Sequence, residues 1–332
     1  MSTKKKAGSL GCGWIGLVVG SLLLALAAIL FIPWNVSGLV SHPQPAASYA
    51  EALQGIEALR AQRPPGALQP ICEVQFLTHG QKAARSIVLV HGYTECPQQF
   101  LALGQRYYDL GYNVLIAPMP HHGLAERMTD EQAHITPGDL VAYADQVVDI
   151  AQGLGEHVTM LGMSGGGVVT GWAAQNRSDL DLAVLVAPAF GLRKVPTLLT
   201  TPVANLYSLL PNSYTWWDET AQEKYLPVYQ YPRYASRALA AYLRLGSAVQ
   251  QQANRRRPAA AKIVVVTNAN DEAVNDALTG HLVQAWQVHA ADLAAYEFPA
   301  SMGLVHDLVD TPGQPTEPVY SKLVELSRGS PE

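Results

Sequence analysis

The sequence predicts an α/β fold in which a mostly parallel central sheet is covered by helices on both faces. From residue 86 onward, short apolar segments rich in β-branched residues alternate with longer segments of helical spacing. The short segments are apolar throughout, which is typical of strands that are buried on both faces. With 332 residues, 48% of them hydrophobic, the chain is long enough to form one large core.

The expected elements follow in order along the chain. Tyr49, Leu53, Ile56 and Leu59 recur at helical spacing, and Pro64-Pro65-Gly66 stops that helix. Residues 73–78 alternate polar and apolar side chains, as in an early antiparallel strand. The later strands are expected at 87–90, 113–117, 158–161, 182–186 and 263–267, with a weaker one near 296–298. The later helices are expected at 98–110, 137–154, 168–177, 272–289 and near 317–328.

One long segment breaks this alternation, between the strands at 182–186 and 263–267. Its roughly 75 residues are too many for a structureless loop in a compact domain, so we expect a helical cap insertion over about 188–260. Most of its aromatic residues should pack within the cap, and a few should line an apolar substrate pocket. They include Tyr207, Tyr214, Trp216, Trp217, Tyr225, Tyr229, Tyr231 and Tyr234.

The N-terminal region predicts a transmembrane signal anchor. Residues 10–32 are almost unbroken apolar sequence, long enough to span the hydrocarbon layer of a bilayer. Lys4-Lys5-Lys6 precede this segment, and Trp14 and Trp34 lie near its ends. We therefore expect residues 1–9 to be a cytoplasmic basic tail, 33–48 a linker, and 49–332 a catalytic domain outside the cytoplasm, periplasmic or extracellular. A cleaved signal peptide and a buried core helix are the alternatives.

The net charge bears on the class of binding partner, and the cysteines bear on whether the folded domain contains a disulfide. The net charge of −5 argues against a nucleic-acid partner, which needs a basic surface. Cys12 lies in the membrane segment, whereas Cys72 and Cys96 flank the first strands of the folded domain. An external location permits a disulfide between Cys72 and Cys96, and two free thiols are the alternative.

The strongest chemical signal is the segment 158–166, where an apolar strand continues directly into Gly162-Met163-Ser164-Gly165-Gly166. G-x-S-x-G between a strand and a helix is the nucleophile elbow of serine hydrolases, which presents a strained serine at a sharp turn. The residues two before and two after the serine crowd each other, and Gly162 and Gly166 meet that restriction. A glycine-rich phosphate-binding turn is the alternative, but a dinucleotide fingerprint would come early in its domain.

A base and an acid are expected to follow the serine in the order Ser…Asp…His. Asp271 comes shortly after the strand at 263–267, and His306 follows the last strand. In open α/β sheets, sites form beyond the carboxyl ends of the strands, so Ser164, Asp271 and His306 should lie together. His306 would take the proton of Ser164, and Asp271 would orient the imidazole and stabilise its charged form.

Two backbone amides are expected to stabilise the oxyanion of the reaction. One is the N–H of Gly165, directly after the serine. The other is the N–H of Tyr93, in the loop after the strand at 87–90, where His91 would shape the loop.

Other histidines and aspartates compete for these roles. His281 and His289 fall in a predicted helix, and Asp276 and Asp292 lie within or at the end of helical segments. His121 and His122 form a pair, but no third metal ligand has suitable spacing. We therefore expect no metal ion here.

Together these motifs resemble the α/β-hydrolase fold, closest to its bacterial carboxylesterase and monoacylglycerol-lipase-like (serine aminopeptidase-type) branch, over roughly residues 70–328. The matching motifs are His91-Gly92-Tyr93-Thr94, Pro120-His121-His122-Gly123, Gly162-Met163-Ser164-Gly165-Gly166, Asp271 and Gly303-Leu304-Val305-His306. The resemblance implies carboxylic-ester hydrolysis, a Ser164–Asp271–His306 triad, a cap inserted after the sixth strand, and no cofactor. Asp271 departs from it, since Glu272-Ala273-Val274-Asn275 follow where the family commonly has a hydrophobic pair and then proline. The HGGG loop of another esterase branch is also absent.

The sequence therefore favours a membrane-anchored serine carboxylic ester hydrolase, a carboxylesterase or lipase-like enzyme acting through an acyl-enzyme. Its partner would be a small-molecule ester with an apolar acyl group, with lipids among the candidates. Two alternatives remain open. The same triad could cleave peptide or amide bonds, or the fold could serve only for binding.

Overall fold

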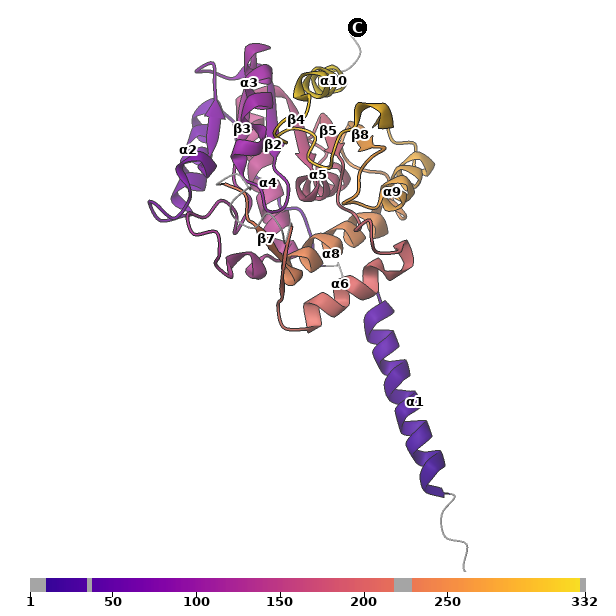
Figure 1. Cartoon of the computed structure of the whole chain (residues 1–332). Helices are drawn as coiled ribbons and strands as arrows, with labels where there is room; N and C mark the ends of the chain where they lie inside the picture. The colour runs from indigo at the N-terminus through magenta and orange to yellow at the C-terminus, as the bar shows by residue number, and fades with distance from the viewer. Residues whose placement is uncertain (1–9, 35–37, 218–228, 329–332) are drawn as a thin grey trace, which may run out of the picture.

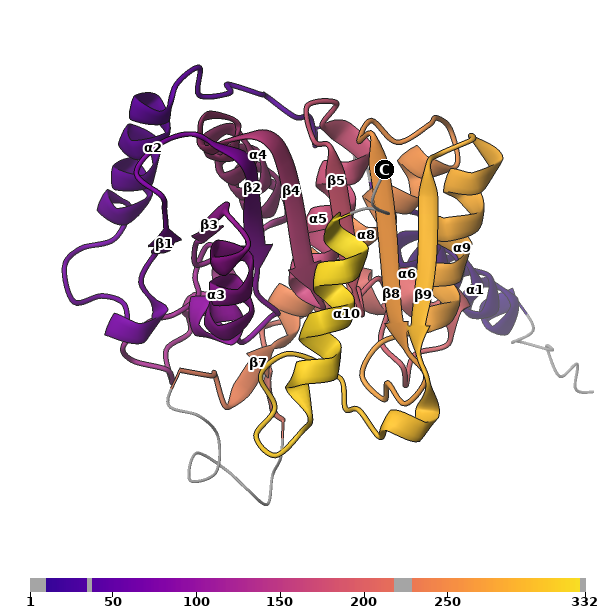
Figure 2. The same cartoon turned by 90° about the horizontal axis from the view of Figure 1, so that it is seen from above.

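The computed structural model, which describes residues 10–34, 38–217 and 229–328, has the predicted α/β architecture. Its seven-stranded sheet has the order β1-β3-β2-β4-β5-β8-β9 (Figure 2). Only the edge strand β1 is antiparallel to its neighbour. The strands are β1 (Gln75–Leu77), β2 (Ala83–Val90), β3 (Tyr112–Ile116), β4 (Gly155–Met163), β5 (Leu182–Val186), β8 (Lys262–Asn268) and β9 (Leu293–Phe298).

Helices cover both faces of the sheet. The helices α3 (Leu101–Asp109) and α10 (Thr316–Arg328) pack on one face, where Leu103 and Leu323 share a core cluster with the strands. The other face is covered by α4 (Pro137–Leu154), α5 (Gly165–Asn176) and α9 (Asp276–Val288), with α2 (Tyr49–Ala61) packed outside α4. Both core clusters consist of buried aliphatic and aromatic side chains, which explains why the strands are apolar throughout.

Two helices begin later than the sequence predicts. The expected helix at 98–110 is a short 3₁₀ turn, η2 (Pro97–Phe100), followed by α3. The expected helix at 272–289 begins only at Asp276, where the side chain of Asn275 caps α9. Asp271 is responsible for this delay, because its Oδ1 accepts hydrogen bonds from the N–H groups of Ala273 and Val274. These bonds hold the intervening residues in a turn.

The expected cap lies between β5 and β8 and is only partly helical. It contains the 3₁₀ turn η4 (Thr197–Leu199), α6 (Thr200–Leu209), α8 (Ser236–Ala253) and an antiparallel hairpin of β6 (Tyr214–Trp216) and β7 (Arg233–Ala235). The hairpin was not predicted, and the guanidinium of Arg233 lies 3.8 Å from the ring centre of Tyr214 across it. The cap follows the fifth strand in the chain and not the sixth, because β1 to β5 are the strands that precede it among the described residues.

The N-terminal helix α1 (Leu10–Phe31) extends away from the rest of the molecule (Figure 1). By length and composition it could cross a membrane, and its apolar window Trp14–Phe31 is not buried by the protein. A signal sequence would share these properties. Lys4-Lys5-Lys6 and Tyr225 lie outside the described residues.

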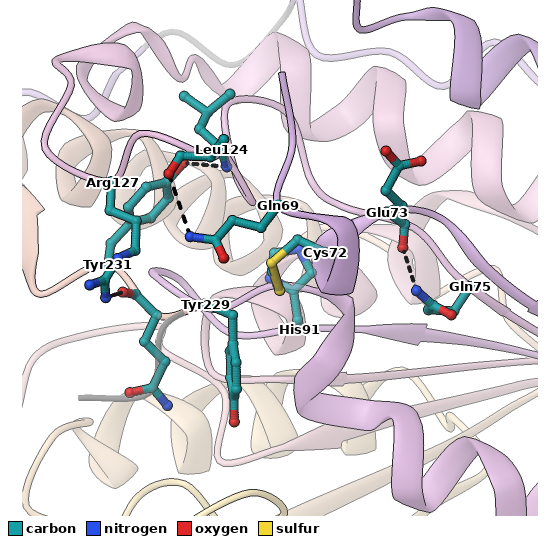
Figure 3. The surroundings of a disulfide bond; sticks show 12 residues. Gln69, Cys72, Glu73, Gln75, His91, Leu124, Arg127, Tyr229 and Tyr231 are labelled. Atoms are coloured by element: carbon teal, nitrogen blue, oxygen red, sulfur yellow. Dashed lines mark hydrogen bonds between the residues drawn. A yellow bond between two sulfur atoms is a disulfide. The ribbon is translucent and has the colours of Figure 1, made fainter. Parts of the chain in front are cut away.

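A disulfide joins Cys72 and Cys96, so the bridged alternative holds (Figure 3). Cys72 ends the 3₁₀ turn η1 (Pro70–Cys72), and Cys96 directly precedes η2. The bond therefore ties the segment before β1 to the loop that follows β2. Gly123 packs so closely here that a Cβ on it would lie 2.9 Å from the Cβ of Cys72.

Candidate active site

The chain turns sharply at Ser164, between β4 and α5. The backbone of Ser164 has φ 55° and ψ −115°, a strained conformation for a residue with a side chain. A Cβ on Gly162 would lie 2.2 Å from the carbonyl oxygen of Gly166, and a Cβ on Gly166 would lie 2.2 Å from that of Val90. Only glycine fits at these two positions, so the sequence permits the turn that exposes the Ser164 hydroxyl.

Three side chains that are far apart in the sequence meet at this turn. The Nε2 atom of His306 lies 2.9 Å from Oγ of Ser164, and its Nδ1 lies 2.7 Å from Oδ2 of Asp271. Each residue follows a different strand of the parallel sheet, at the carboxyl edge where sites of this fold class form. The geometry is a continuous chain of hydrogen-bonding groups from a carboxylate through an imidazole to a hydroxyl.

The Asp271 carboxylate is fully buried and held from two sides. Burial by itself raises its pKa, but the hydrogen bond and charge of His306 and the N–H groups of Ala273 and Val274 outweigh that effect. The result is a pKa below the ordinary value of an aspartate. Asp271 therefore stays ionised and fixes the orientation of the imidazole.

The competing acids and histidines lie elsewhere. Asp276 begins α9, and its pKa is raised to about 6 by burial and by the nearby Asp271 carboxylate. Asp292 directly precedes β9, and His281 and His289 lie in or just after α9. Neither histidine nor Asp292 lines the pocket that contains Ser164.

The loop pair His121 and His122 is held by local contacts. Nδ1 of His121 lies 2.8 Å from a carboxylate oxygen of Glu131, and His122 is buried with its ring edge-on to that of His91. Across the described ranges, no group of three or more His, Cys, Asp or Glu side chains is arranged to hold a metal ion.

The two expected oxyanion donors come from adjacent backbone segments. A Cβ on Gly165 would lie 3.1 Å from the backbone nitrogen of Tyr93, so the loop after β2 touches the start of α5. The phenol of Tyr93 is buried, and its oxygen accepts a hydrogen bond from the N–H of Ala235 at 2.7 Å. Tyr93 thus joins the loop after β2 to the start of α8 in the cap.

Two buried amides position this site and were not predicted. Gln99 accepts a hydrogen bond from the N–H of Gly92 and donates one to Asp307, next to His306. Asn268 donates from Nδ2 to the carbonyl oxygens of Leu304 and Val305, on the other side of His306. A sequence signal existed for Asn268, which ends a strand at the carboxyl edge of the sheet, but none for Gln99.

A cleft of about 1190 Å³ contains both Ser164 and His306. The cap contributes its apolar wall, with Tyr207, Trp216, Trp217, Tyr234, Leu239, Tyr242 and Leu243. Four of the aromatic residues singled out from the sequence therefore line it. Charged groups also line the cleft, namely the acidic Glu95, Glu272, Asp307 and Asp310 and the basic Arg193 and Lys194.

Comparison with known proteins supports the family that the sequence motifs predict. The family model described as serine aminopeptidase, S33, matches residues 81–309. No curated protein matches. A solved structure from work on LipS and LipT, two metagenome-derived lipolytic enzymes, aligns with a TM-score of 0.59 and 17% identity, covering 79% of this chain and 99% of that one.

Two further solved structures are similar in fold. A monoacylglycerol lipase from Paleococcus ferrophilus aligns with a TM-score of 0.58 and 18% identity, covering 76% of this chain and 98% of that one. A monoglyceride lipase from Saccharomyces cerevisiae aligns with a TM-score of 0.56 and 14% identity, covering 75% and 89%. The TM-scores show that these proteins share the fold of this chain, and the family model covers more than half of the chain. The chain therefore belongs to the serine aminopeptidase (S33) family of α/β-hydrolases.

Proposed function

We propose that this protein is a membrane-anchored serine hydrolase that cleaves carboxylic esters through an acyl-enzyme on Ser164. The observation that carries the proposal is the unbroken series of contacts from Asp271 through His306 to Ser164. A hydroxyl is a weak nucleophile until a base removes its proton during attack. His306 Nε2 is within hydrogen-bond distance of that proton, and Asp271 holds the opposite ring nitrogen.

The reaction runs in two halves. Ser164 Oγ attacks the ester carbonyl carbon while His306 takes the hydroxyl proton, and His306 then gives this proton to the departing alkoxide. A water molecule next attacks the acyl-enzyme with His306 again as the base, releasing the carboxylic acid and restoring Ser164. In both halves the N–H groups of Tyr93 and Gly165 face the carbonyl oxygen as its negative charge develops. One such donor contributes about 3 kcal/mol to the stability of the transition state.

The walls of the cleft favour an uncharged apolar acyl group over a charged peptide. The aromatic and aliphatic side chains of the cap form the larger apolar surface. Glu95 is one of the acidic groups that line the cleft, and burial, together with Asp307 and Asp310, raises its pKa well above the ordinary range. This carboxyl is therefore easier to protonate than an ordinary glutamate, which makes it a weaker partner for an ammonium group.

The membrane location rests on α1. An uncleaved anchor would keep the catalytic domain at the outer surface of the membrane, since the lysines before α1 favour the cytoplasmic side. The linker after α1 is also bound to the domain, because Asp145 accepts hydrogen bonds from the Ser41 hydroxyl and from the N–H of His42.

The test uses a fluorophosphonate probe on the full chain in detergent. Wild-type protein should be labelled and Ser164→Ala should not, while both give the same circular dichroism spectrum. A folded wild-type protein that resists the probe would favour the non-catalytic alternative. Matched esters and anilides with the same acyl group then separate esterase from amidase activity, and we expect kcat/KM to be higher for the ester.

A further inference from the structure

The last turn of α1 is bound to the cap. The Nδ2 atom of Asn205 in α6 lies 2.9 Å from the carbonyl oxygen of Leu30 and 3.0 Å from that of Ile32. The last carbonyls of a helix have no partners within it, so a side-chain amide placed there caps the helix. Asn205 is 5% exposed, so this cap is shielded from solvent. Figure 1 shows α6 and α8 on the side of the molecule nearest to α1.

Arg244 of α8 strengthens the same junction. One of its guanidinium nitrogens lies 3.4 Å from Oδ1 of Asn205, and the guanidinium carbon lies 5.1 Å from the ring centre of Trp34. The linker beyond α1 is anchored further along, because the fully buried Arg177 pairs with Asp145 and Asp149, which bind residues 41–44. The orientation of the domain relative to α1 is therefore fixed by contacts on both sides of the helix end.

Next to this junction the cap exposes a cluster of leucines, which we call the leucine face. Leu198 and Leu209 are 85% and 59% exposed, and they lie seven residues before and four residues after Asn205. Leu209 is therefore on the side of α6 that carries Asn205, whereas Leu198 lies in the 3₁₀ turn η4 that precedes α6. The leucine face comprises Leu198, Leu199, Leu206, Leu209 and Leu210, all of them exposed.

The charges around the leucine face suit a lipid surface. Residues 191–217 contain the basic side chains Arg193 and Lys194, which also line the cleft, and no acidic residue. Arg237 adds a third cation here, with its Nε 3.4 Å from the carbonyl oxygen of Leu210. Leucines next to cations are the composition of segments that lie in the interfacial layer of a bilayer, where cations meet lipid phosphates.

We propose that the leucine face lies in the lipid leaflet through which α1 leaves the membrane, so that the cap rests on the bilayer. The position of α1 favours lipid as the partner of the leucine face, because a bilayer that surrounds α1 would end beside Asn205. Tyr207 and Val195 belong to the same segment and line the active-site cleft. If the proposed esterase function holds, acyl esters therefore reach Ser164 from the lipid phase.

Fluorescence depth measurement tests the surface without using activity. In a Cys12→Ser background, Leu209→Cys carries an environment-sensitive nitrobenzoxadiazole label, and the full chain is reconstituted into phosphatidylcholine–phosphatidylglycerol vesicles. Lipids with a nitroxide near the headgroup should quench this label strongly and shift its emission to the blue. The matched control is Leu110→Cys at the end of α3, which is 42% exposed and lies on the opposite face of the sheet from the cap.

Three results would overturn the proposal. Quenching at Leu209 that is as weak as at Leu110 would mean that the leucine face does not touch lipid, and equally strong quenching at both would mean that the contact is not specific to this face. A blue shift at Leu209 that disappears on dilution of protein among vesicles, without quenching by the nitroxide lipids, would mean that a second copy or another protein covers it.

A kinetic arm tests the delivery of substrate. The double variant Leu206→Glu/Leu209→Glu should hydrolyse an ester embedded in vesicles about tenfold more slowly, as expected if about 1.4 kcal/mol of surface binding is lost. It should hydrolyse a water-soluble short-chain ester at the wild-type rate, and Leu110→Glu should match the wild type on both substrates. Equal rates of the double variant and the wild type on the embedded ester, or equal losses on both esters, would contradict lipid-side delivery. Absence of probe labelling at Ser164 would instead remove the esterase proposal and leave the depth measurement intact.

Discussion

Gln99 and Asp307 join the two loops that surround the candidate nucleophile. Nε2 of Gln99 donates to Oδ2 of Asp307 at 3.1 Å, while its Oε1 accepts the N–H of Gly92 at 2.8 Å. Gly92 precedes the expected oxyanion donor Tyr93, and Asp307 follows the expected base His306. The buried amide of Gln99 therefore links the segment of the expected base to the segment of the expected oxyanion donor.

Gln99→Ala should lower kcat more than it changes KM. The variant loses both hydrogen bonds, and the two loops can then separate by fractions of an ångström. We expect a fall in kcat of about tenfold to a hundredfold, because a misplaced catalytic group costs that much. Gln99→Glu keeps an acceptor for Gly92 but repels Asp307, so it should recover only part of the rate. Steady-state kinetics would contradict this positioning role if KM rose while kcat stayed constant.

Ser164→Gly should stabilise the protein while abolishing turnover. The positive φ of Ser164 costs roughly 1–3 kcal/mol that glycine does not pay in the folded state. Glycine also gains entropy in the unfolded chain, so the net gain should be about 1 kcal/mol. Ser164→Ala is the matched control because it keeps the Cβ and the strain. Thermal unfolding that ranks the alanine variant at or above the glycine variant would argue against strain at this turn.

Asp271→Asn should lower kcat by roughly a thousandfold or more, since the amide cannot stabilise the charged imidazole. Asp276→Asn should change kcat little, because Asp276 begins α9 and does not contact His306 through a hydrogen bond in the described structure. The comparison uses one soluble ester at several pH values. A severe loss in Asp276→Asn together with a mild loss in Asp271→Asn would exchange their roles.

Asp310→Asn should stabilise the protein at pH 8 and change stability little at pH 4. Burial raises the pKa of Asp310 to about 6 in the folded state, above the ordinary aspartate value. The folded state therefore binds the proton of Asp310 more tightly than the unfolded state does. Ionisation of Asp310 in the folded protein lowers the free energy of unfolding as the pH rises from about 4 to about 6. Asparagine cannot ionise, so this loss of stability is absent in the variant, and its side-chain oxygen still accepts a hydrogen bond from the Tyr229 hydroxyl. Urea unfolding at both pH values checks this, and an equal difference at each would refute it.

Much of the fold can be predicted from local sequence patterns. The helix expected at 137–154 matches α4 because Thr136 and Asp139 form a capping box and Pro137 occupies the first turn. The late start of α9 was not predictable by the same logic. Helical spacing continues back to residue 272, but the turn around Asp271 takes those residues out of the helix.

In the candidate site, too, some residues can be predicted from local patterns and others cannot. The order and strand-end positions of Ser164, Asp271 and His306 predict that they meet, since parallel strands bring their carboxyl ends to one edge. Gln99 could not be found in this way, because its partner Asp307 is 208 residues away. Asn205 likewise lies 175 residues from the carbonyl of Leu30 that it binds. Contacts of this kind depend on how the elements pack, and no local pattern records them.

The bond between Asn205 and the end of α1 also restricts how the cleft can widen. Lifting α6 would break the hydrogen bonds at Leu30 and Ile32 and separate Asn205 from Arg244. The hairpin at the other end of the cap meets the loop after β2 where Trp217 donates to the hydroxyl of Thr94. The cap is therefore tied at two ends, to α1 through Asn205 and to the loop after β2 through Trp217, and both attachments oppose lifting the cap as one rigid body.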